Sequence, residues 1–398
     1  MRSGVFIAAL VALPACKDDV VTTRPDAAAT LSRSTSLPLY EVTLLPAVPG
    51  ESSRGNGINN RNWVAGLTIK PAGERHATLW RGDDDAAPID LKTLGGMHSA
   101  VIWPGINERG TVVGISQTST LDPLGEEWSC AAFIPASVNT CVGFVWQQGA
   151  MRALPTLGGN NGFATDVNNR GLVVGWAETP VHDPTCVAPQ VLQFKAVIWD
   201  PMRGGKQVLA PFPGDSASAA TAINDRGNAV GISGDCDVAV GRFSARRAIL
   251  WEHGRAIDIG NLGGTSWHTP MDINNADEIV GFSNPPGDAG GEFIAHAFAW
   301  TRRDGIRDLG LLTGDDFSQA FGINARGQIV GRSCGSGGCH ALIWQNGQLI
   351  DLNTRVRGGA SGVLQSAQSI NDEGEITGRI LDATSGLVRA YIATPRER

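Results

Sequence analysis

The feature that most constrains the fold of this chain is a motif that recurs seven times. It reads Ile or Val, then Asn, a short polar turn, two apolar residues and Gly. Successive copies are 47 to 61 residues apart, which is the spacing of β-propeller blades. The asparagines of the seven copies are Asn59, Asn107, Asn168, Asn224, Asn274, Asn324 and Asn371.

Each copy contains the same succession of short strands. INERGTVVG (106–114) reads as strand, turn and strand, with the Asn side chain capping the turn. A third strand ends in Trp, as in RAILW (247–251), and a fourth follows, as in IDIGNL (257–262). Four antiparallel strands form one blade, and blades must stack around an axis to bury their faces. The 51 glycines suit a fold with many tight turns.

The two ends of the chain complete the count. The last repeat lacks a fourth strand, whereas YEVTLL (40–45) is an isolated strand of that type before the first repeat. The sequence therefore predicts an all-β, seven-bladed propeller of four-stranded antiparallel blades, closed by the N-terminal strand joining the last blade. The predicted organisation is 1–15 signal peptide, 16–37 flexible tether and 38–398 propeller.

The repeats resemble the HAF repeat family of probable extracellular bacterial proteins. HAFAW (296–300) and HALIW (340–344) match the third-strand motif that names the family, and the INxxGxxVG and DLGxL segments match its other parts. The resemblance covers nearly the whole chain after the tether. It implies an exported repeat protein and no established biochemical activity.

The N-terminus predicts export. A short apolar run, Val5–Leu13, follows Arg2 and suits a signal peptide. Leu13-Pro14-Ala15-Cys16 resembles a lipobox, which implies a lipid on Cys16, and Lys17 favours the outer membrane or the cell surface. The alternative is an ordinary secretory signal with an incidental cysteine. No apolar run reaches the length of a transmembrane helix.

The six remaining cysteines are an even number, as expected of disulfides in an oxidising compartment. Their positions between second and third strands suggest three pairs, although sequence alone does not fix the connectivity. The candidate pairs are Cys130 with Cys141, Cys186 with Cys236, and Cys334 with Cys339.

The connections between second and third strands vary most in length, with insertions near 118–140 and 178–193. Long loops on a rigid scaffold are common binding sites. We therefore expect the face that carries the 2–3 and 4–1 loops to be functional at blades two to four. Polar residues of the 4–1 loops are candidate ligand-binding residues, with ordinary turn polarity as the alternative reading: His98, Asn160, Asn161, Asp215, His268, Asp315 and Asp316.

Two further positions recur in each repeat. The residue four before the third-strand Trp is mostly basic, and the register predicts that His340 pairs with Asp351 and Arg247 with Asp258 within a blade. A ring of cations for an anionic ligand is the alternative. The repeat tryptophans are expected to pack between blades.

The functional hypotheses are three. The first is a lipid-anchored, monomeric recognition module for a protein or a glycan, and the second is an exported lyase or hydrolase. The third is a purely structural envelope protein. No catalytic or metal-binding motif is found, so no catalytic residue, metal or cofactor is predicted. The net charge of −7 argues against nucleic acid as a partner.

Overall fold

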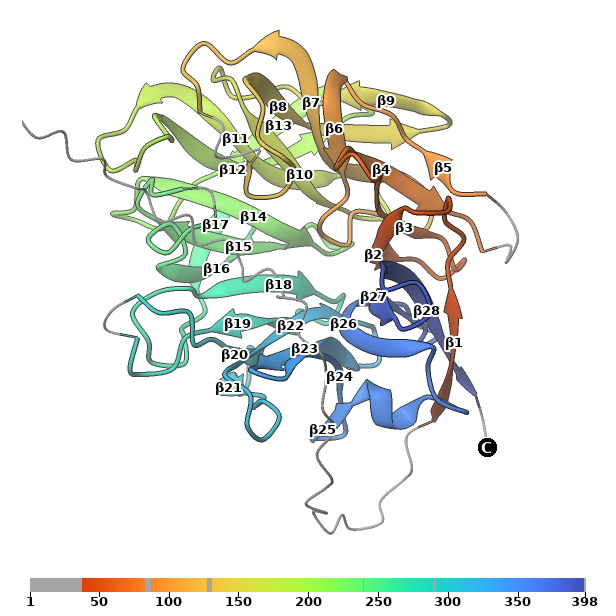
Figure 1. The fold of residues 1–398 in the computed structure, drawn as a ribbon. Coiled ribbons are helices and arrows are strands. Elements are labelled where there is room, and N and C mark those ends of the chain that lie inside the picture. Colours follow the sequence, from red (N-terminus) through yellow and green to blue (C-terminus); the bar gives the residue numbers. More distant parts are fainter. Residues whose placement is uncertain (1–37, 83–86, 127–130, 239, 289–290, 397–398) are drawn as a thin grey trace, which may run out of the picture. The chain divides into compact units, whose positions relative to one another are not determined.

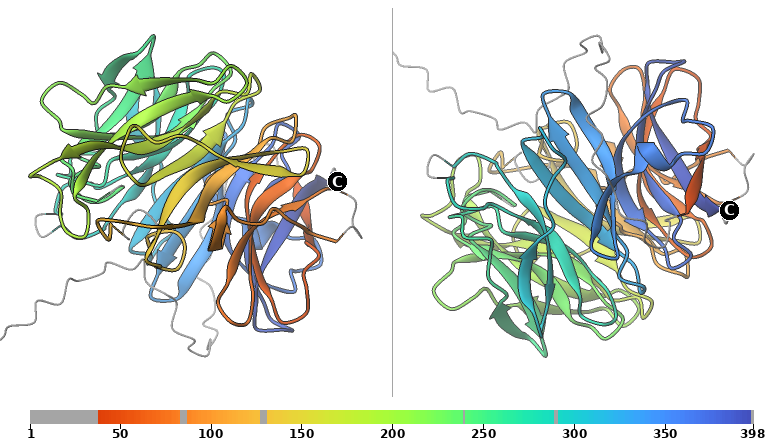
Figure 2. Two further views of the ribbon diagram at one scale, coloured as in Figure 1. Left: turned by 90° about the horizontal axis from the view of Figure 1, so that it is seen from above. Right: turned by 90° about the horizontal axis from the view of Figure 1, so that it is seen from below.

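Seven four-stranded antiparallel sheets form a ring, the architecture that the repeats predict (Figure 1). The computed structural model describes residues 38–398 apart from 83–86, 127–130, 239, 289–290 and 397–398. Two further views show the sheets arranged side by side around a centre (Figure 2). The predicted signal peptide and tether, Cys16 included, lie outside the described residues.

Blades are numbered by repeat, and each runs outward from its first strand. Blade 1 contains β2 (Ser52–Ile58), β3 (Val64–Ile69), β4 (Arg75–Trp80) and β5 (Ile89–Asp90). Blade 2 contains β6 (Gly95–Ala100), β7 (Val112–Leu121), β8 (Asn139–Gln147) and β9 (Ala150–Ala153). Blade 3 contains β10 (Gly162–Val167), β11 (Val173–His182), β12 (Leu192–Asp200) and β13 (Gly205–Leu209). Blade 4 contains β14 (Ala217–Ile223), β15 (Ala229–Gly234), β16 (Arg247–Glu252) and β17 (Arg255–Asp258).

Blade 5 contains β18 (Thr269–Ile273), β19 (Ile279–Ser283), β20 (His296–Thr301) and β21 (Gly305–Asp308). Blade 6 contains β22 (Phe317–Ile323), β23 (Ile329–Gly335), β24 (Gly338–Gln345) and β25 (Gln348–Asp351), followed by the 3-10 helix η1 (Leu352–Arg355). Blade 7 contains β26 (Gly362–Ile370), β27 (Ile376–Asp382) and β28 (Val388–Arg396), and its fourth strand is β1 (Leu39–Leu44).

The ring closes as predicted. β1 pairs antiparallel with β28 from Leu39 opposite Arg396 to Leu44 opposite Tyr391. The buried Tyr40 belongs to the same hydrophobic cluster as Tyr391, so closure buries side chains as well as pairing main-chain groups. The first and last strands of the propeller are thereby held in one sheet.

The repeat asparagine caps its own turn and also joins neighbouring blades. In Asn168, the Oδ1 atom accepts from the main-chain N–H groups of Arg170 and Leu172, at 3.1 and 3.0 Å. Its Nδ2 donates to the main-chain oxygen of Asn224 in the next blade, at 2.9 Å. All seven asparagines make this second bond, including Asn371 to Asn59 across the closure, so a ring of hydrogen bonds runs around the molecule.

The repeat tryptophans pack between blades, which confirms the prediction. Trp146 of blade 2 lies in one cluster with Ala65 and Leu79 of blade 1. The indole N–H of Trp251 in blade 4 donates to the main-chain oxygen of Ala210, which follows the last strand of blade 3, at 2.7 Å. The tryptophans therefore join neighbouring blades by apolar contacts and by hydrogen bonds from the indole N–H.

An apolar cluster shared by blades 1 to 6 fills the middle of the ring. Trp103, Phe133, Phe163 and Trp176 are its aromatic part, with ring centroids 4.8 to 6.1 Å apart. The edge-to-face geometry is a favourable arrangement for aromatic rings. Its members come from six of the seven blades, which places the cluster at the centre of the ring.

Candidate functional site

The long connections lie on the face that the sequence analysis selects. In blade 2, β7 and β8 are separated by residues 122–138, whereas only residues 336 and 337 separate β23 and β24 in blade 6. The LGG-type 4–1 loops contact the second strands that lead into these insertions: the main-chain N–H of Gly159 donates to the oxygen of Glu178, in β11, at 3.0 Å. The 2–3 and 4–1 connections therefore share one side, called here the loop face. The opposite side, formed by the 1–2 and 3–4 turns, is called the turn face.

Two buried carboxylates hold the insertions of blades 2 and 3 together. The Glu126 side chain accepts from the main-chain N–H of Val191, at 2.7 Å. Glu178 accepts from the main-chain N–H of Asn161 at 2.8 Å and from Gln190 Nε2 at 2.9 Å. Burial, and then the neighbouring charge of Glu126, raise the pKa of Glu178 to about 7. The insertions are thus fixed by internal hydrogen bonds.

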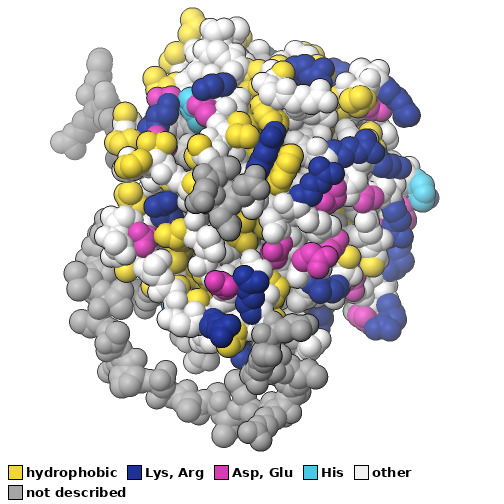
Figure 3. All heavy atoms as spheres, turned by 90° about the vertical axis from the view of Figure 1, so that its right-hand side faces the viewer, with side chains coloured by type: hydrophobic (Ala, Val, Ile, Leu, Met, Phe, Trp, Pro, Cys, Tyr) yellow, Lys and Arg dark blue, Asp and Glu magenta, His cyan; other side chains and the backbone are white. Residues whose placement is uncertain are grey.

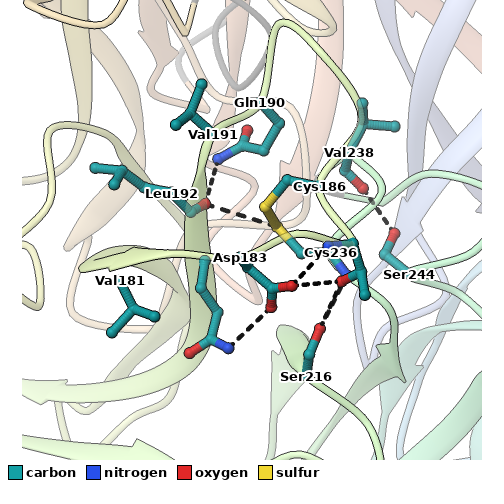
Figure 4. The surroundings of a disulfide bond; sticks show 12 residues. Val181, Asp183, Cys186, Gln190, Val191, Leu192, Ser216, Cys236, Val238 and Ser244 are labelled. Carbon is teal, nitrogen blue, oxygen red and sulfur yellow. Dashed lines mark hydrogen bonds between the residues drawn. A yellow bond between two sulfur atoms is a disulfide. The ribbon is translucent and has the colours of Figure 1, made fainter.

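A disulfide joins the insertions of blades 3 and 4 (Figure 4). Cys186 and Cys236 are bonded as predicted, with Cα atoms 4.2 Å apart. The main-chain N–H of Cys236 also donates to Ser216 Oγ at 3.1 Å. A shallow pocket lies beside this bond, and its lining residues all belong to the blade 3 insertion: His182, Asp183, Pro184, Cys186, Ala188, Gln190 and Val191.

Of the other two predicted cysteine pairs, one lies wholly within the described residues. Cys334 and Cys339 form a disulfide across the β23–β24 hairpin, as predicted. Cys130 lies outside the described residues, so its bond to Cys141 stays a prediction.

Three of the polar candidates are engaged in separate hydrogen bonds, and His98 lies in β6 rather than in the 4–1 loop where the sequence placed it. His98 is buried, and its Nδ1 accepts from the main-chain N–H of Arg75 at 3.1 Å. Asp215 accepts from Ser233 Oγ at 2.7 Å. His268 Nδ1 lies 2.8 Å from Ser283 Oγ. Burial lowers the pKa of both histidines, which favours their neutral forms.

The remaining candidates lie apart from these. Asn160 donates from its main-chain N–H to Glu178 and belongs to the carboxylate network. Asp316 is exposed, and its main-chain N–H donates to the oxygen of Cys334 at 2.8 Å. No hydrogen bond joins any two of His98, Asn160, Asp215, His268 and Asp316. Within the described residues, no group of three or more His, Cys, Asp or Glu could hold a metal ion.

In blades 1, 4, 5 and 6, the basic residue before the third-strand Trp pairs with an Asp of the same blade, as predicted. Blade 2 has Val142 at this position, and Lys195 of blade 3 instead donates to the main-chain oxygen of Ser216. His340 Nδ1 lies 2.8 Å from Asp351 Oδ2, and Arg247 Nη1 lies 3.3 Å from Asp258 Oδ2. The hydrogen bond to Asp351 raises the pKa of His340. These residues therefore link the third and fourth strands of a blade.

Sequence reasoning did not find the most prominent property of the loop face, which is its exposed apolar side chains. Twelve large hydrophobic side chains are exposed in the described part of the chain, and only Met202 and Val208 lie away from this face. Leu121, the last residue of β7, and Val138, in the connection that follows β7, are 66% and 63% exposed. The ten on the loop face are Val48, Met97, Leu121, Leu124, Val138, Val181, Val187, Phe243, Val363 and Leu381.

The turn face carries many charged side chains. Figure 3 shows the molecule from the side, with Lys and Arg concentrated toward one edge and hydrophobic side chains toward the other. Four arginines of the 1–2 and 3–4 turns form ion pairs with acidic residues, so both signs of charge occur on this face. The arginines in these turns are Arg61, Arg81, Arg109, Arg170, Arg203, Arg226, Arg302, Arg303 and Arg326. The two faces thus offer different chemistry, and the apolar one carries the insertions.

Comparisons with known proteins agree with the fold. No family model and no curated protein sequence matches the chain. Among solved structures, it is similar to the β-propeller domain of the Trilobed protease from Pyrococcus furiosus, with a TM-score of 0.52 and 11% identity over 92% of this chain and 96% of that chain. The likeness defines this chain as a β-propeller and shows the fold alone.

Two enzymes resemble the chain less closely. A Pyrococcus horikoshii acylaminoacyl peptidase has a TM-score of 0.47 and 12% identity over 85% of this chain and 52% of the peptidase, so the chain spans about half of its length. A Xanthomonas campestris gluconolactonase has a TM-score of 0.39 and 10% identity over 90% of this chain and 91% of that chain. No helix among the described residues is long and apolar enough to cross a membrane.

Proposed function

We propose that this chain is an exported recognition module that binds a protein partner through the loop face of blades 2 to 4. The carrying observation is a set of six exposed apolar side chains in the 2–3 connections of these blades or at the strand ends that lead into them: Leu121, Leu124, Val138, Val181, Val187 and Phe243. Exposed apolar patches on monomeric proteins commonly mark interaction sites. The disulfide and the carboxylate network limit the ordering entropy that binding would cost.

The side chains of this surface favour a protein over a glycan. Five of the six are aliphatic, and aliphatic groups gain most from burial against other apolar side chains. The enzyme hypothesis requires His98 or His268 to act on a substrate, whereas both are buried and hydrogen-bonded within the fold. Recognition of a protein accounts for the exposed apolar side chains of this face, which the packing of the fold does not require.

The proposal includes export and a lipid anchor on Cys16, with the protein at the outer membrane or the cell surface. Two disulfides in the described residues support an oxidising compartment. A Cys16→Ser variant should lose labelling by radioactive palmitate and leave the membrane fraction. Unchanged labelling and fractionation would contradict the anchor without affecting the loop-face proposal.

Paired substitutions test recognition. We expect the double variant Leu121→Asp, Val138→Asp to lose the protein that co-purifies with the wild-type chain from detergent-solubilised envelopes. The matched control, Met202→Asp with Val208→Asp, changes two similarly exposed apolar side chains away from the loop face and should retain it. Circular dichroism establishes that both variants fold. Equal retention of the partner by the two variants would overturn the proposal.

A further inference from the structure

One position of the repeat points toward the axis in every blade. It is the residue after the glycine of the second strand, and in the first five blades it is apolar and belongs to the central cluster: Leu67, Ile115, Trp176, Ile232 and Phe282. In blades 6 and 7 the same position holds Arg332 and Arg379. At this repeat position, arginines therefore replace the apolar residues in two neighbouring blades.

The strand register extends this change to a third blade. Arg54 of β2 lies opposite Leu67, so it belongs to the same axial layer in blade 1. In blades 6 and 7, the residues opposite the arginines are polar, namely Gln319 and Ser366. Blades 6, 7 and 1 are consecutive in the ring, so their axial layer forms one polar sector.

A fourth arginine reaches this sector from the loop face. Arg75 is the first residue of β4, and its Nη1 donates to the main-chain oxygen of Phe133 in the blade 2 insertion at 3.0 Å. Its main-chain N–H donates to Nδ1 of His98 in β6. Arg54, Arg75, Arg332 and Arg379 are called here the arginine cluster, and Arg75 places it toward the loop face.

Among the described residues, three of the four guanidinium groups have few acceptors. Arg332 donates from Nε and Nη2 to Gln319 Oε1, at 2.9 and 2.7 Å. The Nε atoms of Arg54, Arg75 and Arg379 are buried and have no hydrogen-bond partner. Within the described residues, none of these three side chains forms an ion pair with a carboxylate. All four arginines are partly exposed, so solvent reaches the cluster.

The cluster is electrostatically unfavourable without an anion. Burial, and then the charges of Arg54, Arg332 and Arg75, lower the pKa of Arg379 well below its usual value. Buried charges are ordinarily paired, because removing an ion from water without compensation is costly. Guanidinium groups bind carboxylate and phosphate oxygens with two parallel hydrogen bonds, and several of them together suit an anion with more than one charge.

We propose that the arginine cluster binds a small multivalent anion of the polycarboxylate or phosphate class. The anion would lie at the axis between blades 6, 7 and 1 and would receive hydrogen bonds from the three arginines whose Nε atoms lack acceptors. The site is separate from the apolar side chains of the proposed recognition surface, and it requires no protein partner.

Titration calorimetry on the full chain tests this site with citrate and with pyrophosphate, in a buffer of low chloride concentration. We expect at least one of these probes to bind with a dissociation constant of about 1 mM or tighter. Arg379→Met should weaken binding roughly tenfold or more, as for the loss of a charge-assisted hydrogen bond. Arg303→Met makes the same change at an exposed arginine of the turn face and should bind like the wild type.

The outcomes separate clearly. Binding of citrate alone identifies a polycarboxylate site, and binding of pyrophosphate alone identifies a phosphate site. Failure of both probes to bind, or equal binding by the wild-type and Arg379→Met chains, overturns the proposal. If Arg379→Met does not fold, Arg54→Met replaces it with the same expected loss. Neither result depends on the partner of the loop face, so the two proposals can fail independently.

Discussion

At the scale of single residues, one amide side chain performs two tasks in this ring. Its oxygen accepts two main-chain N–H groups of its own turn, and its nitrogen donates to the next blade. The repeat asparagines are all nearly fully buried, so a lost partner would leave a polar atom without water. Such losses cost roughly 1–3 kcal/mol each.

Asn168→Asp separates the two tasks, because aspartate keeps the acceptor oxygen and loses the Nδ2 donor to Asn224. We expect the free energy of unfolding to fall by about 1–3 kcal/mol at neutral pH, measured by urea denaturation. The same substitution at Asn261, an exposed residue whose side chain accepts only from the nearby N–H of Gly263, should change it by less than about 0.5 kcal/mol. Equal effects at both positions would show that the inter-blade bond does not stabilise the ring.

These residue roles were predictable only in part. The cap by Asn168 could be predicted because its partners are two and four residues away. The donor bond to Asn224 could not, because it depends on how neighbouring blades stack. Arg379 occupies a repeat position that is apolar in five other blades, and aligning the repeats at this position would have singled it out.

Glu178 makes stability depend on pH. Its pKa is raised from 4.5 to about 7 in the folded protein, so the folded state holds this proton more tightly than the unfolded chain does. Stability from this group is present at low pH and is lost as pH rises from about 4.5 to about 7. The Glu178→Gln variant cannot ionise at this position. Between pH ~5 and ~7.5, the free energy of unfolding of the wild type should therefore fall by roughly 1–3 kcal/mol more than that of the variant. If the wild type and Glu178→Gln lost the same free energy of unfolding between these two pH values, the raised pKa of Glu178 would be contradicted.

At the scale of elements, the variable connections between β7 and β8 and between β11 and β12 distinguish this propeller from a uniform ring. Their existence could be predicted from the repeat spacing, and the bond between Cys186 and Cys236 from their placement in neighbouring insertions. The burial of Glu126 could not be predicted, because its acceptor role depends on N–H groups of Val191 and Leu192 in another blade. Sequence therefore locates the loops, whereas tertiary contacts decide their shape.

The double variant Cys186→Ser, Cys236→Ser should loosen the insertions of blades 3 and 4. The bond closes a loop across 50 residues, and bonds of this kind stabilise proteins by about 2–4 kcal/mol. We expect faster hydrogen exchange at residues 183–191 and a lower unfolding temperature. Cys334→Ser with Cys339→Ser, which removes a bond across only 5 residues, should have the smaller effect. A larger effect of the second pair would contradict this ranking.

At the scale of the whole molecule, stability depends on closing the ring through β1. Removing residues 38–45 would expose the edge of β28 and the cluster around Tyr391. We expect the shortened chain to unfold at a lower denaturant concentration and to aggregate, since unpaired edge strands promote association. Glu41→Gln removes only the exposed pair with Arg396 and should cost less than about 1 kcal/mol. Equal stability of the full and shortened chains would show that blade 7 holds without its fourth strand.

The ring supplies a stable platform, and the proposed function belongs to the apolar side chains that it exposes on one face. The most direct test places a photoreactive amino acid at Val138 on the loop face and, in a second strain, at Met202 on the turn face. After illumination of living cells, the account predicts a covalent adduct with one defined protein from position 138 and none from position 202. Adducts with the same protein from both positions, or from 202 alone, would contradict recognition by the loop face.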